Sequence, residues 1–159
     1  MTHPCTLFFK DVEWGEIIVA ALAQHLLGFL WYGSIFTAVY QYYTAADKGV
    51  KRVEYIVQRY GVTLCSLGTI LSGVLRALFI TAIANQLKVS SICALHEVAA
   101  FVAVLSIVYE HHSLSAQRPF PLILINSGYE IAAALTGATV LFYIREAQAI
   151  AAIKGTLGF

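Results

Sequence analysis

The stretch that decides the fold runs from Pro119 to Ile144 and reads PFPLILINSGYEIAAALTGATVLFYI. From Pro121 it provides about two dozen residues, and a helix rising roughly 1.5 Å per residue then covers a bilayer core of about 30 Å. Apart from small hydroxyls, its polar residues are Asn126 and Glu130, which lie one helical turn apart and point the same way. A carboxylate at membrane depth is costly unless it meets a partner. The stretch therefore predicts neighbouring helices and a cationic or polar group opposite Glu130.

Composition extends this prediction to the whole chain. Its 159 residues are 59% hydrophobic and 12% charged, whereas soluble domains are near half apolar and a quarter charged. We expect an all-α, four-transmembrane-helix antiparallel bundle, formed as a single integral membrane domain over residues 1–159. The expected spans are about 17–40, 60–86, 90–109 and 121–144. The net charge of +1 argues against nucleic acid as a partner.

The longest polar connection, from Thr44 to Tyr60, separates the first two expected spans. In a helix, Lys51, Tyr55 and Arg59 would share one face there. We expect an interfacial helix running into the second span, with a solvated loop as the alternative that hydropathy leaves open. Its cations would contact lipid headgroups: Lys51, Arg52 and Arg59.

Small residues recur at every fourth position through the second span, from Gly61 to Thr81. Such a small-xxx-small pattern lets the backbone of a neighbouring helix approach closely. Small residues also follow Glu130 on its face of the fourth span. We predict helix packing at Gly61, Thr69, Gly73, Ala77, Gly128 and Gly137.

Polar side chains inside the four expected spans fall at similar depths. Counted along alternating spans, most lie roughly 12–14 Å from one membrane side, and Glu130 lies about one turn deeper. We therefore expect one intramembrane polar layer in which Arg76 faces Glu97 or Glu130, with Gln24 as a hydrogen-bonding neighbour. Its predicted members are His25, Arg76, His96, Glu97, Asn126 and Glu130.

This layer has a structural and a functional interpretation. As a structural element it fixes how the helices pack, because removing one partner strands the other at a cost of several kcal/mol. As a functional element it would form a proton or ion path, or a substrate pocket. A fixed cation such as Arg76 opposes reversible protonation of a neighbouring acid, which favours the structural interpretation. Two acids for one arginine leave one acid unpaired, so the functional interpretation stays open.

Catalytic and cofactor motifs are not evident in the sequence. No Ser, His and Asp set and no open metal site has usable spacing, and Cys5, Cys65 and Cys93 lack CxxC spacing. The adjacent His111 and His112 would point about 100° apart on a helix, which is poor geometry for chelation. We expect no enzymatic activity, no cofactor and no metal. Bound phospholipids are expected, with cardiolipin as a candidate.

Two segments resemble a known family. Gly28, Trp31-Tyr32-Gly33 and Phe36, with Tyr40 beyond, are similar to the pattern G-x-x-W-Y-[SG]-x-x-F followed by an aromatic residue. Arg118-Pro119 and then Ile125-Asn126-x-Gly128-Tyr129 resemble the pattern R-P…I-N-x-G-Y. These patterns are those of the small four-helix membrane proteins catalogued as domain of unknown function 1761.

The resemblance extends from the first expected helix to the fourth, and the second pattern is the more specific. It implies the fold and membrane residence, and it implies no reaction. The chain departs from the patterns at three positions. Ser34 replaces a frequent Pro, Tyr40 a frequent Trp, and Glu130 stands where His is common.

We carry two hypotheses for function. The favoured one is a non-catalytic accessory subunit of a larger membrane complex, with a mitochondrial respiratory or other bioenergetic complex as the candidate. The small-residue faces and an apolar tail from Ala147 to Phe159 favour contacts with other membrane subunits and with lipids. The alternative is a small transporter or channel using the Arg/Glu/His layer. Met1 to Glu16 has neither the basic region of a secretory signal nor the composition of a transit peptide. We expect the mitochondrial inner membrane, with a bacterial plasma membrane as the alternative.

Overall fold

The computed structural model describes residues 12–108 and 110–157, and this part of the chain contains helices and no strand. The predictions for Cys5, for the leader within residues 1–11 and for the end of the third span at Tyr109 lie outside the described residues. The all-α class is confirmed. In chain order the elements are α1 (Trp14–Leu30), the π-helical η2 (Trp31–Ile35), α2 (Thr37–Asp47), the 3-10 turn η3 (Val53–Tyr55), α3 (Val62–Leu87), α4 (Ile92–Val108), α5 (His111–Ser115) and α6 (Phe120–Leu157).

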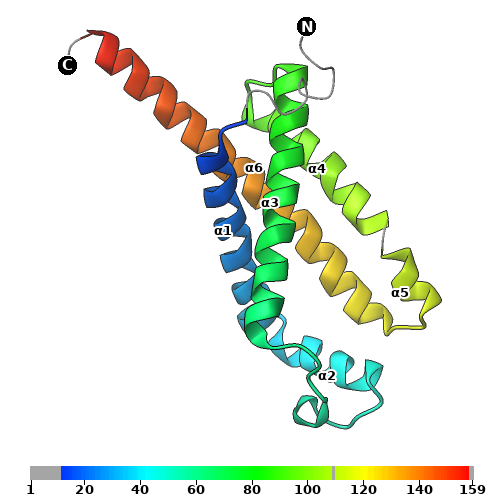
Figure 1. Cartoon of the computed structure of the whole chain (residues 1–159). Coiled ribbons are helices and arrows are strands. Elements are labelled where there is room, and N and C mark those ends of the chain that lie inside the picture. The colour runs from blue at the N-terminus through cyan, green and yellow to red at the C-terminus, as the bar shows by residue number, and fades with distance from the viewer. Residues whose placement is uncertain (1–11, 109, 158–159) are drawn as a thin grey trace, which may run out of the picture.

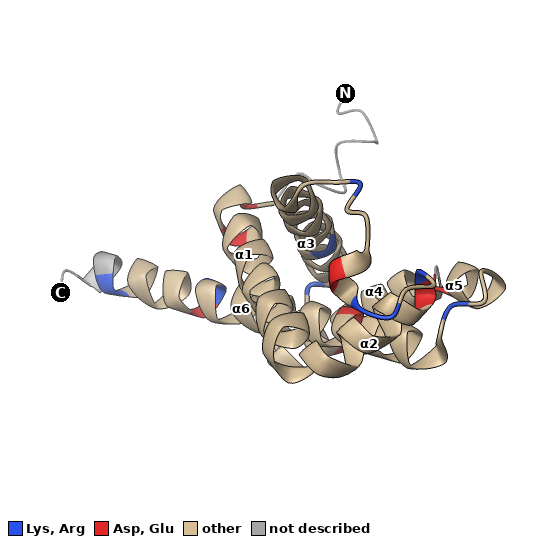
Figure 2. Cartoon of the chain, turned by 90° about the horizontal axis from the view of Figure 1, so that it is seen from below, with Lys and Arg blue, Asp and Glu red and all other residues tan. Residues whose placement is uncertain are grey.

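Four helical segments within the described residues are long and apolar enough to cross a membrane. They are Trp14–Ile35, Val62–Leu87, Ile92–Ser115 and Phe120–Lys154. Their bodies carry few charges, and Figure 2 shows Lys, Arg, Asp and Glu gathered mainly in the connections and near the far end of α6. The prediction of four membrane-span-like helices is confirmed.

The core lies where α1, α3, α4 and α6 meet (Figure 1). α1 packs against both α3 and α6, and α4 packs mainly on α6. The buried residues of α3 all fall from Gly73 to Ala84, so the residues before Gly73 contribute none. Small side chains at the contact allow close helix packing. The core side chains include Ile17, Ala20, Ala77, Ile80, Ala134, Ala138 and Leu141.

The helix predicted from Thr44 to Tyr60 is wrong in its extent. α2 ends at Asp47, and Gly49 adopts a left-handed φ of 69°, the conformation that commonly terminates a helix. Beyond it only η3 is helical, and Arg52 is extended. The three cations predicted to contact lipid headgroups are exposed but share no helical face: Lys51, Arg52 and Arg59.

The apolar tail expected after Glu146 is the continuation of α6. This helix runs unbroken for 38 residues, because Ala, Gln and Ile residues follow Glu146 without a Pro or Gly before position 155. Its last part projects away from the other helices in Figure 1. Ile150 and Ile153 on this part are exposed.

Candidate functional site

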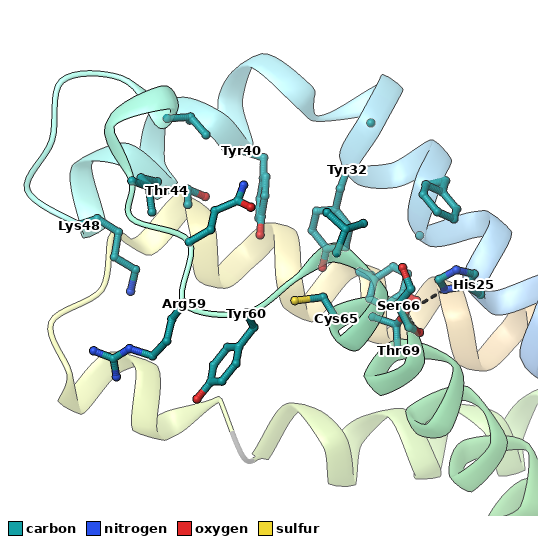
Figure 3. Close-up of a pocket in the computed structure, with 18 of the residues that line it drawn as sticks. His25, Tyr32, Tyr40, Thr44, Lys48, Arg59, Tyr60, Cys65, Ser66 and Thr69 are labelled. Atoms are coloured by element: carbon teal, nitrogen blue, oxygen red, sulfur yellow. Dashed lines mark hydrogen bonds between the residues drawn. The ribbon is translucent and has the colours of Figure 1, made fainter.

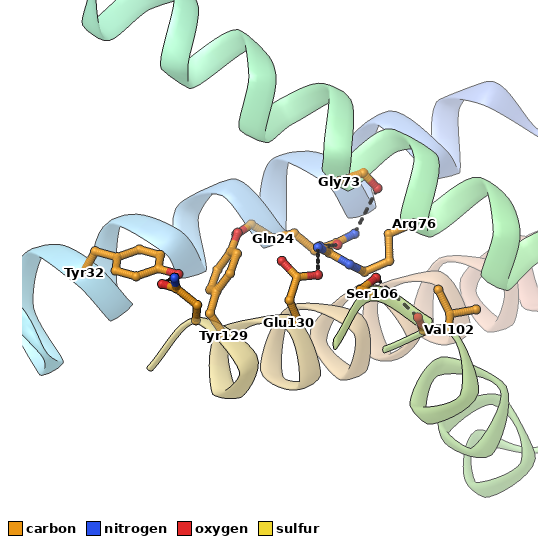
Figure 4. A network of polar contacts seen from close by, with 9 residues as sticks. Gln24, Tyr32, Gly73, Arg76, Val102, Ser106, Tyr129 and Glu130 are labelled. Atoms are coloured by element: carbon orange, nitrogen blue, oxygen red, sulfur yellow. Dashed lines mark hydrogen bonds and ion pairs between the residues drawn. The ribbon is translucent and has the colours of Figure 1, made fainter. Parts of the chain in front are cut away.

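The centre of the molecule is an ion pair between Arg76 of α3 and Glu130 of α6 (Figure 4). The Arg76 Nη2 lies 2.5 Å from the Glu130 Oε2, and the Arg76 Nη1 donates a 2.6 Å hydrogen bond to the Gln24 Oε1 of α1. Arg76 is only 6% exposed. The sequence predicted either Glu97 or Glu130 as the partner of this arginine, and the structure shows that the partner is Glu130.

Gln24 connects this ion pair to the backbone of a neighbouring helix. Its Nε2 donates to the Gly73 carbonyl oxygen at 3.3 Å and to the Ala20 carbonyl oxygen at 3.2 Å. A Cβ at Gly137 would lie 2.7 Å from this nitrogen, so the glycine provides the space for the amide. Arg76, Glu130 and Gln24 therefore form one network joining α1, α3 and α6, and each charge has an opposite charge or an amide beside it.

A second set of contacts joins α1 and η2 to the start of α6. The Trp31 Nε1 donates to the Ile125 carbonyl oxygen at 3.1 Å, and the Tyr32 hydroxyl donates to the Asn126 Oδ1 at 3.2 Å. The Tyr129 hydroxyl donates to the Gln24 carbonyl oxygen at 3.2 Å. The two segments that carry the family resemblance are thus each other's contact partners, although they lie nearly 100 positions apart along the chain.

Two glycines make this contact possible. A Cβ at Gly28 would lie 3.2 Å from the Tyr129 hydroxyl oxygen, and one at Gly128 would lie 3.1 Å from the Trp31 ring. Both glycines belong to the sequence patterns, as do the two aromatic rings they face. The π-helical turn η2 begins at Trp31, and such turns are frequent at functional sites.

The prediction of one continuous polar layer is wrong for four of its six members, because Asn126 bonds to Tyr32 and neither histidine nor Glu97 bonds to the Arg76–Glu130 pair. The His25 Nδ1 lies 2.8 Å from the Thr69 Oγ1, and the His96 Nε2 lies 2.9 Å from the Thr139 Oγ1. Glu97 is exposed and has no hydrogen bond or ion pair to the described residues. Successive helical residues point about 100° apart, so His96 turns toward α6 and Glu97 turns outward.

The packing residues predicted on α3 fall into two groups, one buried and one exposed. Gly73 and Ala77 are buried, and a Cβ at Gly73 would lie 3.2 Å from the Ala21 carbonyl oxygen. Gly61 is exposed with no atom within 4 Å of a Cβ placed on it, so its packing prediction is wrong. Thr69 is exposed and binds His25 instead of forming part of a tight helix contact. Apart from this hydrogen bond, a pocket separates the first turns of α3 from α1.

Sequence reasoning missed a second buried ion pair. Glu16 of α1 is 5% exposed, and its Oε2 lies 3.1 Å from the Arg145 Nε of α6. Both residues fall at the same end of the expected alternating spans, and that shared end was a usable signal. Among the described residues, no group of three or more His, Cys, Asp and Glu side chains could hold a metal ion.

The comparison of the chain with known protein families agrees with the resemblance that the two motifs carry. The family described as "Protein of unknown function (DUF1761)" matches residues 16–142, which is most of the chain. The chain belongs to the DUF1761 family. The resemblance drawn from the two motifs is confirmed, and both motifs lie inside the matched DUF1761 region. Neither the curated proteins nor the solved structures provide a match.

Replacing Trp31 by Phe is expected to lower the free energy of unfolding by about 1–2 kcal/mol, because the indole hydrogen bond to the Ile125 carbonyl oxygen is lost. The measurement is unfolding in mixed detergent micelles, followed by circular dichroism. Trp14 is 60% exposed, so Trp14→Phe is the matched control and should leave stability unchanged. Equal losses in the two variants would show that the contact between the motifs contributes nothing.

Proposed function

We propose that this DUF1761 protein is a non-catalytic subunit of a larger membrane assembly, with its four apolar helices crossing the bilayer as antiparallel spans. In this proposal the Arg76–Glu130–Gln24 network holds α1, α3 and α6 together and performs no chemistry. The two charges neutralise each other inside the bundle. Breaking such a pair strands a charge, so its contribution is to fix one arrangement of the helices.

The observation that carries the proposal is the exposure of Glu97. It lies about 7.5 Å beyond the first residue of α4, counted along the helix axis. The residues that follow on its exposed face are apolar: Ala100, Phe101 and Val104. A carboxylate that faces acyl chains is costly unless a cation neutralises it. A transmembrane helix of another subunit, carrying Lys, Arg or His at the same depth, would supply that cation.

Two further surfaces favour an assembly. The projecting part of α6 exposes Ile150 and Ile153, and the first half of α3 exposes Leu64, Leu67 and Leu71. Neighbouring subunits and lipids would cover both surfaces. The identity of the membrane stays a prediction, with the mitochondrial inner membrane ahead of a bacterial plasma membrane.

The transporter or channel alternative has less support. Its pathway would need groups that are free to bind and release the transported ion, whereas the Glu130 carboxylate is held in an ion pair by the buried Arg76. Glu130→Gln in liposomes tests this alternative through proton or cation flux. Flux that depends on Glu130 would favour transport over the subunit role.

We expect the chain, extracted from its native membrane in mild detergent, to co-purify with a stoichiometric membrane partner. Glu97→Gln should lower the recovered partner about tenfold, which corresponds to a loss of roughly 1.4 kcal/mol of binding free energy. The matched control is Glu54→Gln, because Glu54 is exposed in η3, outside α4. Migration of the wild-type chain as a free monomer or homodimer would overturn the proposal.

A further inference from the structure

A large pocket lies on a different part of the molecule from Glu97. It is bounded by the second half of α1 with η2, the first half of α3 and the connection that holds η3 (Figure 3). Its volume is about 1030 Å³, just above the roughly 300–1,000 Å³ typical of small-molecule sites. Tyr32 and Tyr129, two residues of the contact between the motifs, are part of its wall.

The polarity of the pocket changes along its length. Lys48 and Arg59 lie at one end in Figure 3, on the connection beyond the ends of α1 and α3. His25 and Thr69 lie at the other end, where their side chains are hydrogen-bonded to each other. Thr69 is about 10 Å along α3 from its first residue. The rest of the lining includes Phe29, Tyr32, Val57, Val62 and Cys65.

The outer end of the pocket carries an excess of positive charge. Arg59 is exposed and forms no ion pair with the described residues. Lys48 lies 3.1 Å from Asp47, but Arg118 also approaches that single carboxylate at 3.9 Å. The Thr44 hydroxyl, which lines the same pocket, is buried and has no hydrogen-bond partner among the described residues. An anion with further acceptor oxygens would match these groups.

We propose that this pocket binds an anionic phospholipid. The headgroup phosphate lies between Lys48 and Arg59, at the level where the helices leave the apolar region. One acyl chain follows Phe29, Val62 and Cys65 toward the His25–Thr69 pair. The apolar wall selects a lipid over free phosphate, because an inorganic ion leaves that wall uncovered. The two cations select an anionic headgroup over a zwitterionic one.

Cys65 lines the pocket, whereas Cys93 is exposed on α4 and does not. The full chain with Cys5→Ser therefore reports occupancy through the alkylation rates of these two thiols in detergent. Phosphatidylglycerol should slow alkylation of Cys65 and leave Cys93 unchanged. Phosphatidylcholine and inorganic phosphate, each at the same concentration, should protect neither thiol. Protection of Cys65 by phosphatidylcholine to the same degree, or equal slowing of both thiols, would overturn the proposal.

A pair of charge variants tests the headgroup site. Arg59→Gln should raise the phosphatidylglycerol concentration needed for half-protection of Cys65 about tenfold, because a charge-assisted hydrogen bond to the phosphate is lost. Arg52→Gln removes the same charge from the same connection, but Arg52 does not line the pocket, so half-protection should not move. Equal shifts in the two variants would mean that general surface charge attracts the lipid, and the site would be rejected. The shift in half-protection is measured at Cys65, which lines the pocket, so it does not depend on a protein partner bound at Glu97.

Discussion

Arg76→Leu is expected to destabilise the protein by about 3–5 kcal/mol, because it leaves the Glu130 carboxylate without its cation inside the bundle. The same change removes the 2.6 Å hydrogen bond that the Gln24 Oε1 accepts from the Arg76 Nη1. Arg76 is 6% exposed, so water replaces few of these contacts. Unfolding in mixed micelles, followed by circular dichroism, measures the loss.

The double variant Arg76→Leu/Glu130→Leu separates a stranded charge from lost packing. Replacing both members of a buried ion pair by apolar side chains is often close to neutral. We therefore expect the double variant to be more stable than either single variant. The coupling free energy from the double-mutant cycle should exceed the roughly 0.3–0.5 kcal/mol scatter seen for independent sites.

Arg118→Leu is the matched control for the loss of an arginine. The Arg118 side chain is 41% exposed and lies 3.9 Å from Asp47. Exposed ion pairs of this kind contribute about 0–1 kcal/mol. A loss in Arg76→Leu no larger than that of Arg118→Leu would contradict the central position of the Arg76–Glu130 pair.

Hydropathy and the cost of buried charge were enough to predict four apolar helices and a polar partner for Glu130. They did not determine which acid faces Arg76, because that depends on how each helix is rotated about its axis. Glu97 and His96 are adjacent in sequence, and only His96 turns toward α6. A depth count places residues along a span and contains no information about that rotation.

The contact between the two motifs shows a second limit. Trp31 and Asn126 stood out from the sequence as members of two patterns, but hydropathy does not specify which helices are neighbours. The structure places α1 against α6, and the hydrogen bonds of Trp31 and Tyr32 to the start of α6 follow from that placement. The helix expected between Thr44 and Tyr60 failed for a local reason, because the left-handed Gly49 follows the end of α2.

The small-residue pattern of α3 predicted close packing over most of the helix, but the buried residues of the helix begin only at Gly73. A four-residue spacing of small side chains permits a close approach and cannot say where a neighbouring helix provides one. Gly73 lies where α1 does approach. Gly68 lies in the open half of the same helix, with no atom within 4 Å of a Cβ placed on it.

Gly73→Leu is expected to destabilise the protein by about 3 kcal/mol, at the upper end of typical overpacking effects. Its Cβ would lie 3.2 Å from the carbonyl oxygen and 3.3 Å from the Cα of Ala21. These are backbone atoms and cannot rotate away, so α1 and α3 must separate. Separation also lengthens the hydrogen bond from the Gln24 Nε2 to the Gly73 carbonyl oxygen, which is already 3.3 Å.

Gly68→Leu makes the same substitution on the same helix and distinguishes overpacking from the intrinsic effect of leucine. A glycine inside a helix is less favourable than alanine by about 0.8–1.0 kcal/mol, and leucine is nearly as good a helix former as alanine. Gly68→Leu should therefore leave stability unchanged or raise it, while Gly73→Leu lowers it in the same mixed-micelle unfolding assay. Equal destabilisation of the two variants would show that α1 does not approach α3 closely at Gly73. Gln24 of α1 would then not hold Arg76 of α3 toward Glu130 either, because the Gln24–Arg76 hydrogen bond needs α1 and α3 to be close together.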